Sequence, residues 1–373
     1  MIKDRQKSLG LLIGERLKLA RKEAKLTQDK LANLLGFNSR QILDNIEAGI
    51  RKVSAEELIA IMNIFKKPLD YFTDPFLILG DKLFSWRAEP NVSAIEEYEL
   101  KARNIVGAFR FFCDVLDKPP SPIVHSLALT AKSSYEEAQE AGERIVKQFD
   151  LGVVPATNLV SVIEEKLGIH TLYVDAPSGI SGAACHLTDI IFIFINRNEP
   201  EPRRNYDLAH EFFHVLTWNE IPPSKVDAGL FQKMAPRAEQ LADNFAAALL
   251  MPEFELKKIW QKYHSSIKGP NITDCINLTA QHFKVSSQAL RWRLRNLKWV
   301  DDSEELGIDE KRLKWNVIEE KPLLYSKSFV EKLKNAIEKG YISVRRAAQL
   351  LDYSIDDMAD LIRSYGLEVP FDL

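Results

Sequence analysis

The sequence predicts a mainly helical protein with a small mixed β-sheet near its middle, which is an α+β fold. Apolar residues at helical spacing, with helix-capping residues at their ends, occupy most of the 373 residues. Two central runs, "IHTLYVD" and "IIFIFIN", instead have the β-branched and aromatic character of strands. A chain of this length exceeds an ordinary single domain, so we expect two or three domains.

Composition and charge narrow the class of protein. The N-terminus lacks the apolar core of a signal peptide, and no uncharged apolar run approaches the roughly 20 residues of a membrane span, so we expect a cytoplasmic protein with no membrane partner. Cys113, Cys185 and Cys275 are far apart, which predicts buried thiols and no disulfide framework. Residues 1–75 hold 14 Lys/Arg against 10 Asp/Glu, a balance of +4, whereas the remainder holds 36 against 43, a balance of −7. A basic head on an acidic body permits a nucleic-acid partner at the head.

Residues 1–75 predict an N-terminal domain of five short helices. Thr27 precedes an apolar pattern that closes at Gly36, as an N-cap does. Ser54 and Glu57 have the spacing of a capping box at the start of a later helix. The turn "FNS" between the second and third helices suggests a helix-turn-helix.

A helix-turn-helix presents short polar side chains of its second helix to the edges of bases. Ile42, Leu43 and Ile46 can pack inward, which leaves the polar side chains of this helix facing outward. Arg and Gln have donor and acceptor geometry that suits guanine and adenine edges, and a helix N-terminus suits phosphate. The DNA-binding residues predicted in this way are Gln28, Ser39, Arg40, Gln41 and Asn45. The alternative is a helical interaction module on the same fold.

The stretch "LTQDKLANLLGFNSRQILDNIEAGIRKVSAEELIAIMNIFKKPLDYF" resembles the XRE-family helix-turn-helix domain of Cro-type repressors. Thr27-Gln28, Leu31-Ala32, Leu35-Gly36, Ile46-Glu47 and Arg51 are among the matching features. The resemblance implies a double-stranded DNA operator as partner and makes a homodimer one option. Two features depart from the family. The turn after Gly36 is one residue longer, and Asp44 stands near the expected phosphate, which its charge would repel.

Residues 76–145 are expected to form a helical connector, and residues 146–300 a second domain. In the second domain, the stretch "YDLAHEFFHVL" places His210 and His214 four positions apart, on one face of a helix. Glu211 lies beside the first histidine. This is the His-Glu-x-x-His arrangement of zinc hydrolases, in which two histidines hold the ion and the carboxylate accepts a proton from water. The alternative is a partly buried helix whose histidines bond to neighbours.

A catalytic zinc site needs a third protein ligand and an open fourth position. The predicted helix "RAEQLADNFAAALL" offers Glu239 as that ligand, with Asp243 one turn later on the same face. Asp243 could accept the N–H of a ligand histidine and so determine its tautomer. The small side chains of this helix would allow a close approach to the first helix. Alternatively, Glu239 is a solvated residue at a helix start and Asp243 is a surface charge.

These segments resemble the ImmA/IrrE family of metallopeptidases. The matching stretches are "GISGAA", "LAHEFFH", Glu239 with Ala242-Asp243, and "FAAALLMP", while "FSWRAEP" resembles a short element often found between such modules. The resemblance implies a gluzincin-like domain with one Zn²⁺ per chain on His210, His214 and Glu239, and with Glu211 as the base. It also implies a protein substrate, because characterised members cleave or inactivate helix-turn-helix repressors.

Two residues of this region carry open interpretations. Asp207 stands where the family often has Thr, and we interpret it as a residue of the helix start. His186 follows the "GISGAA" stretch and could face the cleft, although a core or surface histidine is the simpler interpretation.

Residues 301–373 predict a helical C-terminal region. The stretch "ISVRRAAQLLDYSIDDMADLIRSYG" resembles two helices of a helix-turn-helix, but its second helix carries Asp356, Asp357 and Asp360, which disfavours DNA contact. Protein contact or dimerisation is the preferred role. The chain is thus expected to be a stress- or prophage-type transcriptional regulator that cleaves a repressor, or itself. The alternative is a non-catalytic regulator or antitoxin-like protein whose zinc fold is structural or sensory.

Overall fold

A computed structural model gives the fold of the chain. It describes most of the sequence, namely residues 2–80, 83–88, 94–116, 126–187, 189–227, 236–266, 271–300, 307–314 and 320–372. Its contacts divide the chain into two compact units. The first combines the residues up to Leu79 with Arg103–Phe111, and the second contains the rest.

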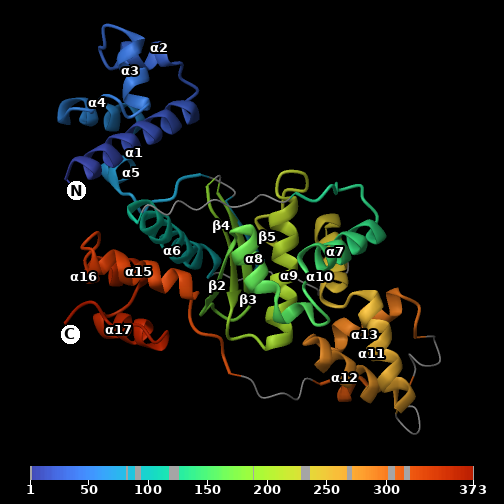
Figure 1. Cartoon of the computed structure of the whole chain (residues 1–373). Coiled ribbons are helices and arrows are strands. Elements are labelled where there is room, and N and C mark those ends of the chain that lie inside the picture. Colours follow the sequence, from blue (N-terminus) through green and yellow to red (C-terminus); the bar gives the residue numbers. More distant parts are fainter. Residues whose placement is uncertain are drawn as a thin grey trace. The chain divides into compact units, whose positions relative to one another are not determined.

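The N-terminal unit contains the five helices that the sequence predicts (Figure 1). They are α1 (Ile2–Glu23), α2 (Gln28–Leu34), α3 (Arg40–Glu47), α4 (Ala55–Phe65) and α5 (Leu69–Thr73). Each contributes to one apolar core through a fully buried side chain, these being Leu17, Leu31, Leu43, Ile61 and Phe72.

The expected caps set the helix boundaries of this unit. The Thr27 hydroxyl accepts a hydrogen bond from the backbone N–H of Lys30 at 3.2 Å. Ser54 and Glu57 form the predicted capping box, in which each side chain accepts from the backbone N–H of the other. Such caps satisfy N–H groups that have no partner within the helix. The local sequence therefore determines where these helices begin.

The second unit contains a five-stranded mixed sheet. Its strands are β1 (Phe84–Ala88), β2 (His170–Val174), β3 (Ile180–His186), β4 (Ile191–Asn196) and β5 (Val226–Asp227). They lie in the order β2-β4-β3-β1-β5. Strands β2 and β4 are parallel, as are β1 and β5, whereas β3 runs antiparallel to both β4 and β1. The predicted α+β class is confirmed.

The structure differs from the expected connector over residues 76–145. Phe84–Ala88 is a strand of the sheet, with β3 on one side and β5 on the other. All five of its residues are buried, and the rings of Phe84 and Trp86 stack with centroids 5.5 Å apart. A run this short shows no clear period, so only the pairing partners identify it as a strand. The helices α6 (Ile95–Val115) and α7 (Tyr135–Phe149) complete the described part of the segment.

The helices beside the sheet bring two segments together. Helix α9 (Glu201–Thr217) packs on β3 and β4, and α10 (Arg237–Leu250) packs on both α9 and α7 (Figure 1). Gly142 permits the contact between α7 and α10, because a Cβ there would lie 2.6 Å from the carbonyl oxygen of Phe245. The short helices η1 (Pro155–Thr157) and α8 (Leu159–Leu167) precede β2.

The remaining helices lie C-terminal to α10. They are α11 (Glu253–Ser266), α12 (Ile272–Phe283), α13 (Ser287–Asn296), η2 (Glu310–Arg312), α15 (Lys327–Glu338), α16 (Val344–Leu351) and α17 (Ile355–Ser364). The C-terminal helices attach to β2, where the backbone N–H of Tyr325 donates to the carbonyl of Tyr173 at 2.6 Å. Within the described residues, no helix has the length and apolar character needed to cross a bilayer.

Candidate metal centre

Helix α9 supplies three residues of the candidate site. His210, Glu211 and His214 are each 1% exposed, because nearly every residue of the second half of this helix is buried against the sheet and α10. The two histidines lie one turn apart, and their rings meet edge to face with centroids 4.8 Å apart. The helical spacing therefore brings the two Nε2 atoms to 3.1 Å from each other.

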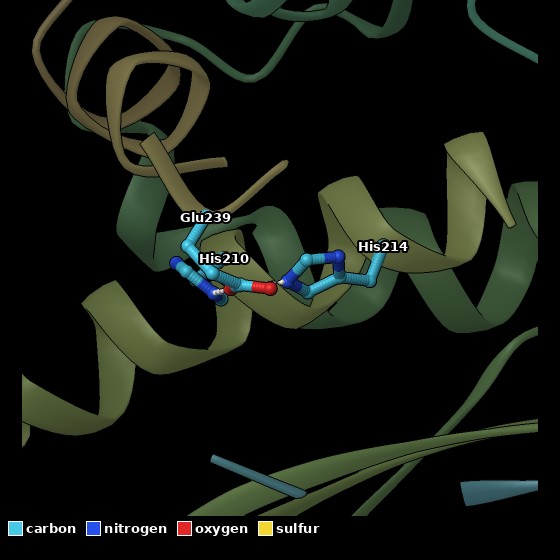
Figure 2. A group of neighbouring side chains, drawn as sticks. All are labelled: His210, His214 and Glu239. Carbon is cyan, nitrogen blue, oxygen red and sulfur yellow. Dashed lines mark hydrogen bonds and ion pairs between the residues drawn. The ribbon is translucent and has the colours of Figure 1, made fainter. Parts of the chain in front are cut away.

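Helix α10 supplies the acidic residues. Glu239 is 2% exposed, and its Oε2 lies 3.1 Å from His210 Nε2 and 3.0 Å from His214 Nε2. Figure 2 shows the three side chains converging from the two helices. One turn along α10, Asp243 Oδ1 lies 3.0 Å from His210 Nδ1. Glu239 is thus neither solvated nor isolated, which removes the structural alternative raised for it.

The donor set of His210, His214 and Glu239 fits a divalent metal ion. Two ligands about 2.0–2.1 Å from a tetrahedral zinc ion lie roughly 3.3 Å apart, close to the distances between these atoms. Asp243 Oδ1 is placed to accept the Nδ1–H of His210, and in that tautomer Nε2 would offer its lone pair to a metal ion shared with Glu239. Among the described residues, Glu239 Oε1 is buried without a hydrogen-bond partner. A buried group of acceptors is costly unless a cation lies between them.

Electrostatics of the site favour positive charge. Burial and the charge of Arg87 lower the pKa of His210, but hydrogen bonds to Asp243 and Glu239 outweigh both and raise it to about 10. Burial opposes ionisation of Glu239, yet its bonds to the two histidines bring its pKa below the usual value. The pKa of Asp243 is also lowered, because its contact with His210 outweighs its burial. Two carboxylates thus stay ionised beside the histidines.

Glu211 lies beside the metal-ligand group without belonging to it. The opposite strand makes room for its side chain at Gly182, where a Cβ would lie 3.7 Å from Glu211 Cγ and 2.8 Å from the carbonyl oxygen of Phe194. A larger residue at position 182 would therefore clash with the backbone of β4, whereas its Cβ would only touch Glu211. The glycine of the "GISGAA" stretch thus permits the close approach of β3 and β4 beside Glu211.

Two charged residues near the site were not assigned there by the sequence. Arg87 of β1 is 1% exposed, and its Nε lies 2.8 Å from Oδ1 of Asp207, which is fully buried. The helix-start interpretation of Asp207 is wrong, because α9 already begins at Glu201 and Asp207 faces the sheet. A charged residue inside the aromatic run "FSWRA" was the one available signal, since a buried arginine requires an acidic partner.

His186 does not join the metal-ligand group. Its ring stacks on Trp218, with centroids 5.2 Å apart and an interplanar angle of 17°. Burial lowers its pKa. This half-buried position agrees with the simpler interpretation, in which His186 is a core or surface histidine.

The predicted DNA-binding residues lie at the start of α3 and opposite it on α2. Leu43 and Ile46 are fully buried and Ile42 is partly buried, so the polar side chains lie on the other face of α3. Arg40 Nε donates to Gln28 Oε1 at 2.9 Å, and Gln41 Nε2 donates to Asn45 Oδ1 at 3.1 Å. These bonds link four of the five predicted residues in two pairs.

The remaining polar residues of this face are Ser39 and Asp44. Ser39 is the exposed N-cap of α3 and makes no side-chain capping bond. Asp44 Oδ1 accepts from Gln28 Nε2 at 3.2 Å. The carboxylate of Asp44 therefore holds Gln28 on the face that would meet a duplex.

Comparison with known families agrees with this geometry. Residues 17–72 match the family profile described as helix-turn-helix, and residues 164–295 match the profile of the IrrE N-terminal-like domain, a peptidase family. No curated protein compared with the chain matches it. The chain joins an XRE-type helix-turn-helix domain to an IrrE/ImmA-like peptidase domain, as the resemblance implied.

Proposed function

We propose that this protein is a DNA-binding transcriptional regulator whose IrrE/ImmA-like domain is a zinc-dependent endopeptidase. The observation that carries the proposal is the buried group of His210, His214 and Glu239, with Asp243 on the far nitrogen of His210. The family profile supports a peptidase-type domain, and the helix-turn-helix profile supports a DNA partner.

Each residue of the centre has a defined task in this proposal. His210, His214 and Glu239 would hold one zinc ion per chain, and Asp243 would keep the Nε2 lone pair of His210 directed at it. Bound zinc would supply polarisation of the peptide carbonyl and acidification of water. Glu211 accepts a proton from the attacking water and delivers it to the leaving amine.

The N-terminal domain would direct the protein to an operator. Ser39, Arg40 and Gln41 lie at the start of α3 and Asn45 one turn further along it, and these side chains would meet base edges, while Gln28 would contact phosphate. A dimer would read two half-sites of an inverted repeat.

The proposed substrate is a helix-turn-helix repressor, which includes this protein itself. Cleavage would separate the DNA-binding domain from the rest of the repressor. Transcription would then no longer be silenced, as in a stress or prophage-type response. This choice follows the ImmA/IrrE resemblance, and a protein that carries both modules in one chain offers its own head as a substrate.

The deciding experiment replaces Glu211 by Gln in the full chain. The variant keeps the size and hydrogen bonding of the side chain but cannot accept the proton. We expect it to fold, to retain zinc and to bind DNA, while cleavage of repressors encoded nearby falls by at least about 10²–10⁴-fold, the usual contribution of general acid–base catalysis. Glu220→Gln, the same change at an exposed residue just beyond α9, should leave cleavage unchanged.

One observation favours a second function. His210, Glu211, His214 and Glu239 are all at most 2% exposed, so a peptide cannot reach them in this conformation. In the second function the centre is structural or sensory, in a regulator or antitoxin-like protein. Unchanged cleavage and unchanged regulation in the Glu211→Gln protein would favour it, and metal analysis of the purified chain would identify zinc or manganese.

A further inference from the structure

The centre is supported by a buried arginine from β1. Arg87 pairs in register with Gly182 of β3 and Asp227 of β5, and its side chain is 1% exposed. A guanidinium removed from water is costly unless carboxylates compensate it. Arg87 Nε lies 2.8 Å from Asp207 Oδ1, and Arg87 Nη2 lies 3.7 Å from Asp243 Oδ1.

The contact with Asp243 connects this arginine to a proposed metal ligand. Asp243 Oδ1 is the same oxygen that accepts from His210 Nδ1 at 3.0 Å. Arg87 and His210 therefore converge on one carboxylate oxygen. The arginine limits where the Asp243 carboxylate can lie, and the carboxylate sets the orientation of the His210 ring.

Asp207 holds the arginine in place. Its Oδ1 faces Arg87, and its Oδ2 accepts from Arg203 Nε at 3.1 Å. Arg203 also donates to Ser181 Oγ of β3 at 3.0 Å. With both carboxylate oxygens engaged, Asp207 offers Arg87 a rigid partner, so the position of the guanidinium is determined by α9 as well as by β1.

We propose that Arg87 is a positioning residue of the metal centre and acts on His210 through Asp243, an inference that rests on the proposed metal site. Arg87 lies outside both matched segments, 17–72 and 164–295. The segment between the two recognised domains thus completes the centre. The IrrE-like domain without β1 would leave the buried Asp207 and the partly exposed Asp243 with less positive charge to compensate them.

The test measures zinc affinity of the full-length chain by competition with a chelating dye. We expect Arg87→Met to weaken zinc binding about 10–100-fold, the usual effect of removing a residue that orients a ligand. Arg87→Lys keeps the positive charge but loses the planar guanidinium group, so we expect a smaller loss of zinc affinity. Arg21→Met is the control, because Arg21 is also buried and its Nε pairs with Glu47 Oε1 at 2.6 Å within the N-terminal unit. It should lower the melting temperature of the metal-free protein without changing zinc affinity.

A double-mutant cycle tests the route through Asp243. If Arg87 acts through that carboxylate, Arg87→Met in an Asp243→Ala background should weaken zinc binding no further. Additive losses would overturn the inference, as would a folded Arg87→Met protein with wild-type zinc affinity. If the Arg87→Met protein fails to fold, the same comparison is made with Arg87→Lys, in the wild-type and the Asp243→Ala backgrounds. A wild-type chain that binds neither zinc nor Co²⁺ would instead contradict the proposed function itself.

Discussion

A single hydrogen bond sets the chemistry that His210 can perform. Asp243 Oδ1 lies 3.0 Å from Nδ1 and can accept a proton from it, so when a metal ion displaces the proton from Nε2 the lone pair of Nε2 is free to bind that ion. Histidine ligands in metal sites commonly have such a partner, which adds basicity and limits ring rotation. The carboxylate is a quarter exposed, so this support is within reach of solvent.

The first prediction concerns the proposed ligands. His210→Ala and His214→Ala should largely abolish copurified zinc, which should be near one ion per wild-type chain, because each removes one of three protein donors. Glu239→Ala should weaken binding strongly, and Asp243→Ala more mildly, about 10–100-fold. Elemental analysis and dye competition measure both.

Glu137→Gln serves as a control for this series, since its side chain caps α7 and has no contact with the centre. Full zinc retention by the Glu239→Ala protein would show that the third ligand is misassigned.

At the scale of elements, the junction of α8 with β2 contains the partly buried carboxyl group of Glu164. Burial raises the pKa of Glu164 to about 7, although the backbone N–H of Thr171 donates to it at 3.1 Å and opposes that shift. The neutral form therefore fits the fold better than the charged form. This favourable contribution is fully present below about pH 4.5 and is lost as the pH rises through about 7.

The second prediction follows from this loss of stability as the pH rises. Glu164→Gln mimics the neutral carboxyl, so it should be about 1–3 kcal/mol more stable than wild type at pH 8 and nearly equal to it at pH 5. Denaturant unfolding of both proteins at the two pH values measures the difference. Glu165→Gln, its exposed neighbour, should track wild type throughout. A Glu164→Gln advantage that does not change with pH would rule out this titration.

The C-terminal elements extend the sheet-containing unit. Beyond the backbone bond to Tyr173, the Tyr325 hydroxyl donates to the Tyr353 hydroxyl at 3.3 Å, and the Arg197 guanidinium donates to the carbonyl of Pro322 at 3.2 Å. The end of β2 is thus bonded to residues far along the chain. A role of this region in dimerisation or partner binding stays a prediction, and the exposed Asp356, Asp357 and Asp360 still argue against DNA.

At the scale of the whole molecule, the two recognised domains have separate cores. The core of the N-terminal unit contains residues from Leu17 to Phe72, whereas a separate core of the second unit contains residues from Leu127 to Ile308. An independent core permits a domain to fold alone. The head should therefore form most of its core when the remainder of the chain is removed, and a fragment that loses Leu79 and Arg103–Phe111 should be less stable than the whole unit.

The third prediction uses this independence. A fragment of residues 1–75 should select a specific duplex from random sequences, most simply as a dimer on an inverted repeat. Arg40→Ala or Gln41→Ala should weaken binding at the selected site by about 1–3 kcal/mol and relax base preference. Lys18→Ala, at an exposed residue of α1, should leave base preference unchanged. A fragment without sequence preference would contradict the transcriptional role.

Part of the fold and site could be predicted because the signals are local. Caps such as Thr27 and Ser54 act within one helical turn, and His210 and His214 share a helix face by spacing alone. Two runs of β-branched and aromatic residues were enough to predict β2 and β4. The strand β1 and the place of Asp207 were not predicted correctly, because both depend on pairing between segments more than 90 residues apart, such as Arg87 with Gly182.

The sequence by itself determined the class of fold, the two modules and the pair of histidines on α9, since these depend on composition, period and spacing along the chain. Only the tertiary structure decided that Glu239 and Asp243 reach those histidines and that Arg87 reaches Asp243. Those contacts require α10 to pack against α9 and β1 to enter the sheet beside β3. Packing between distant segments depends on all the side chains between them at once, so no local pattern in the sequence encodes it.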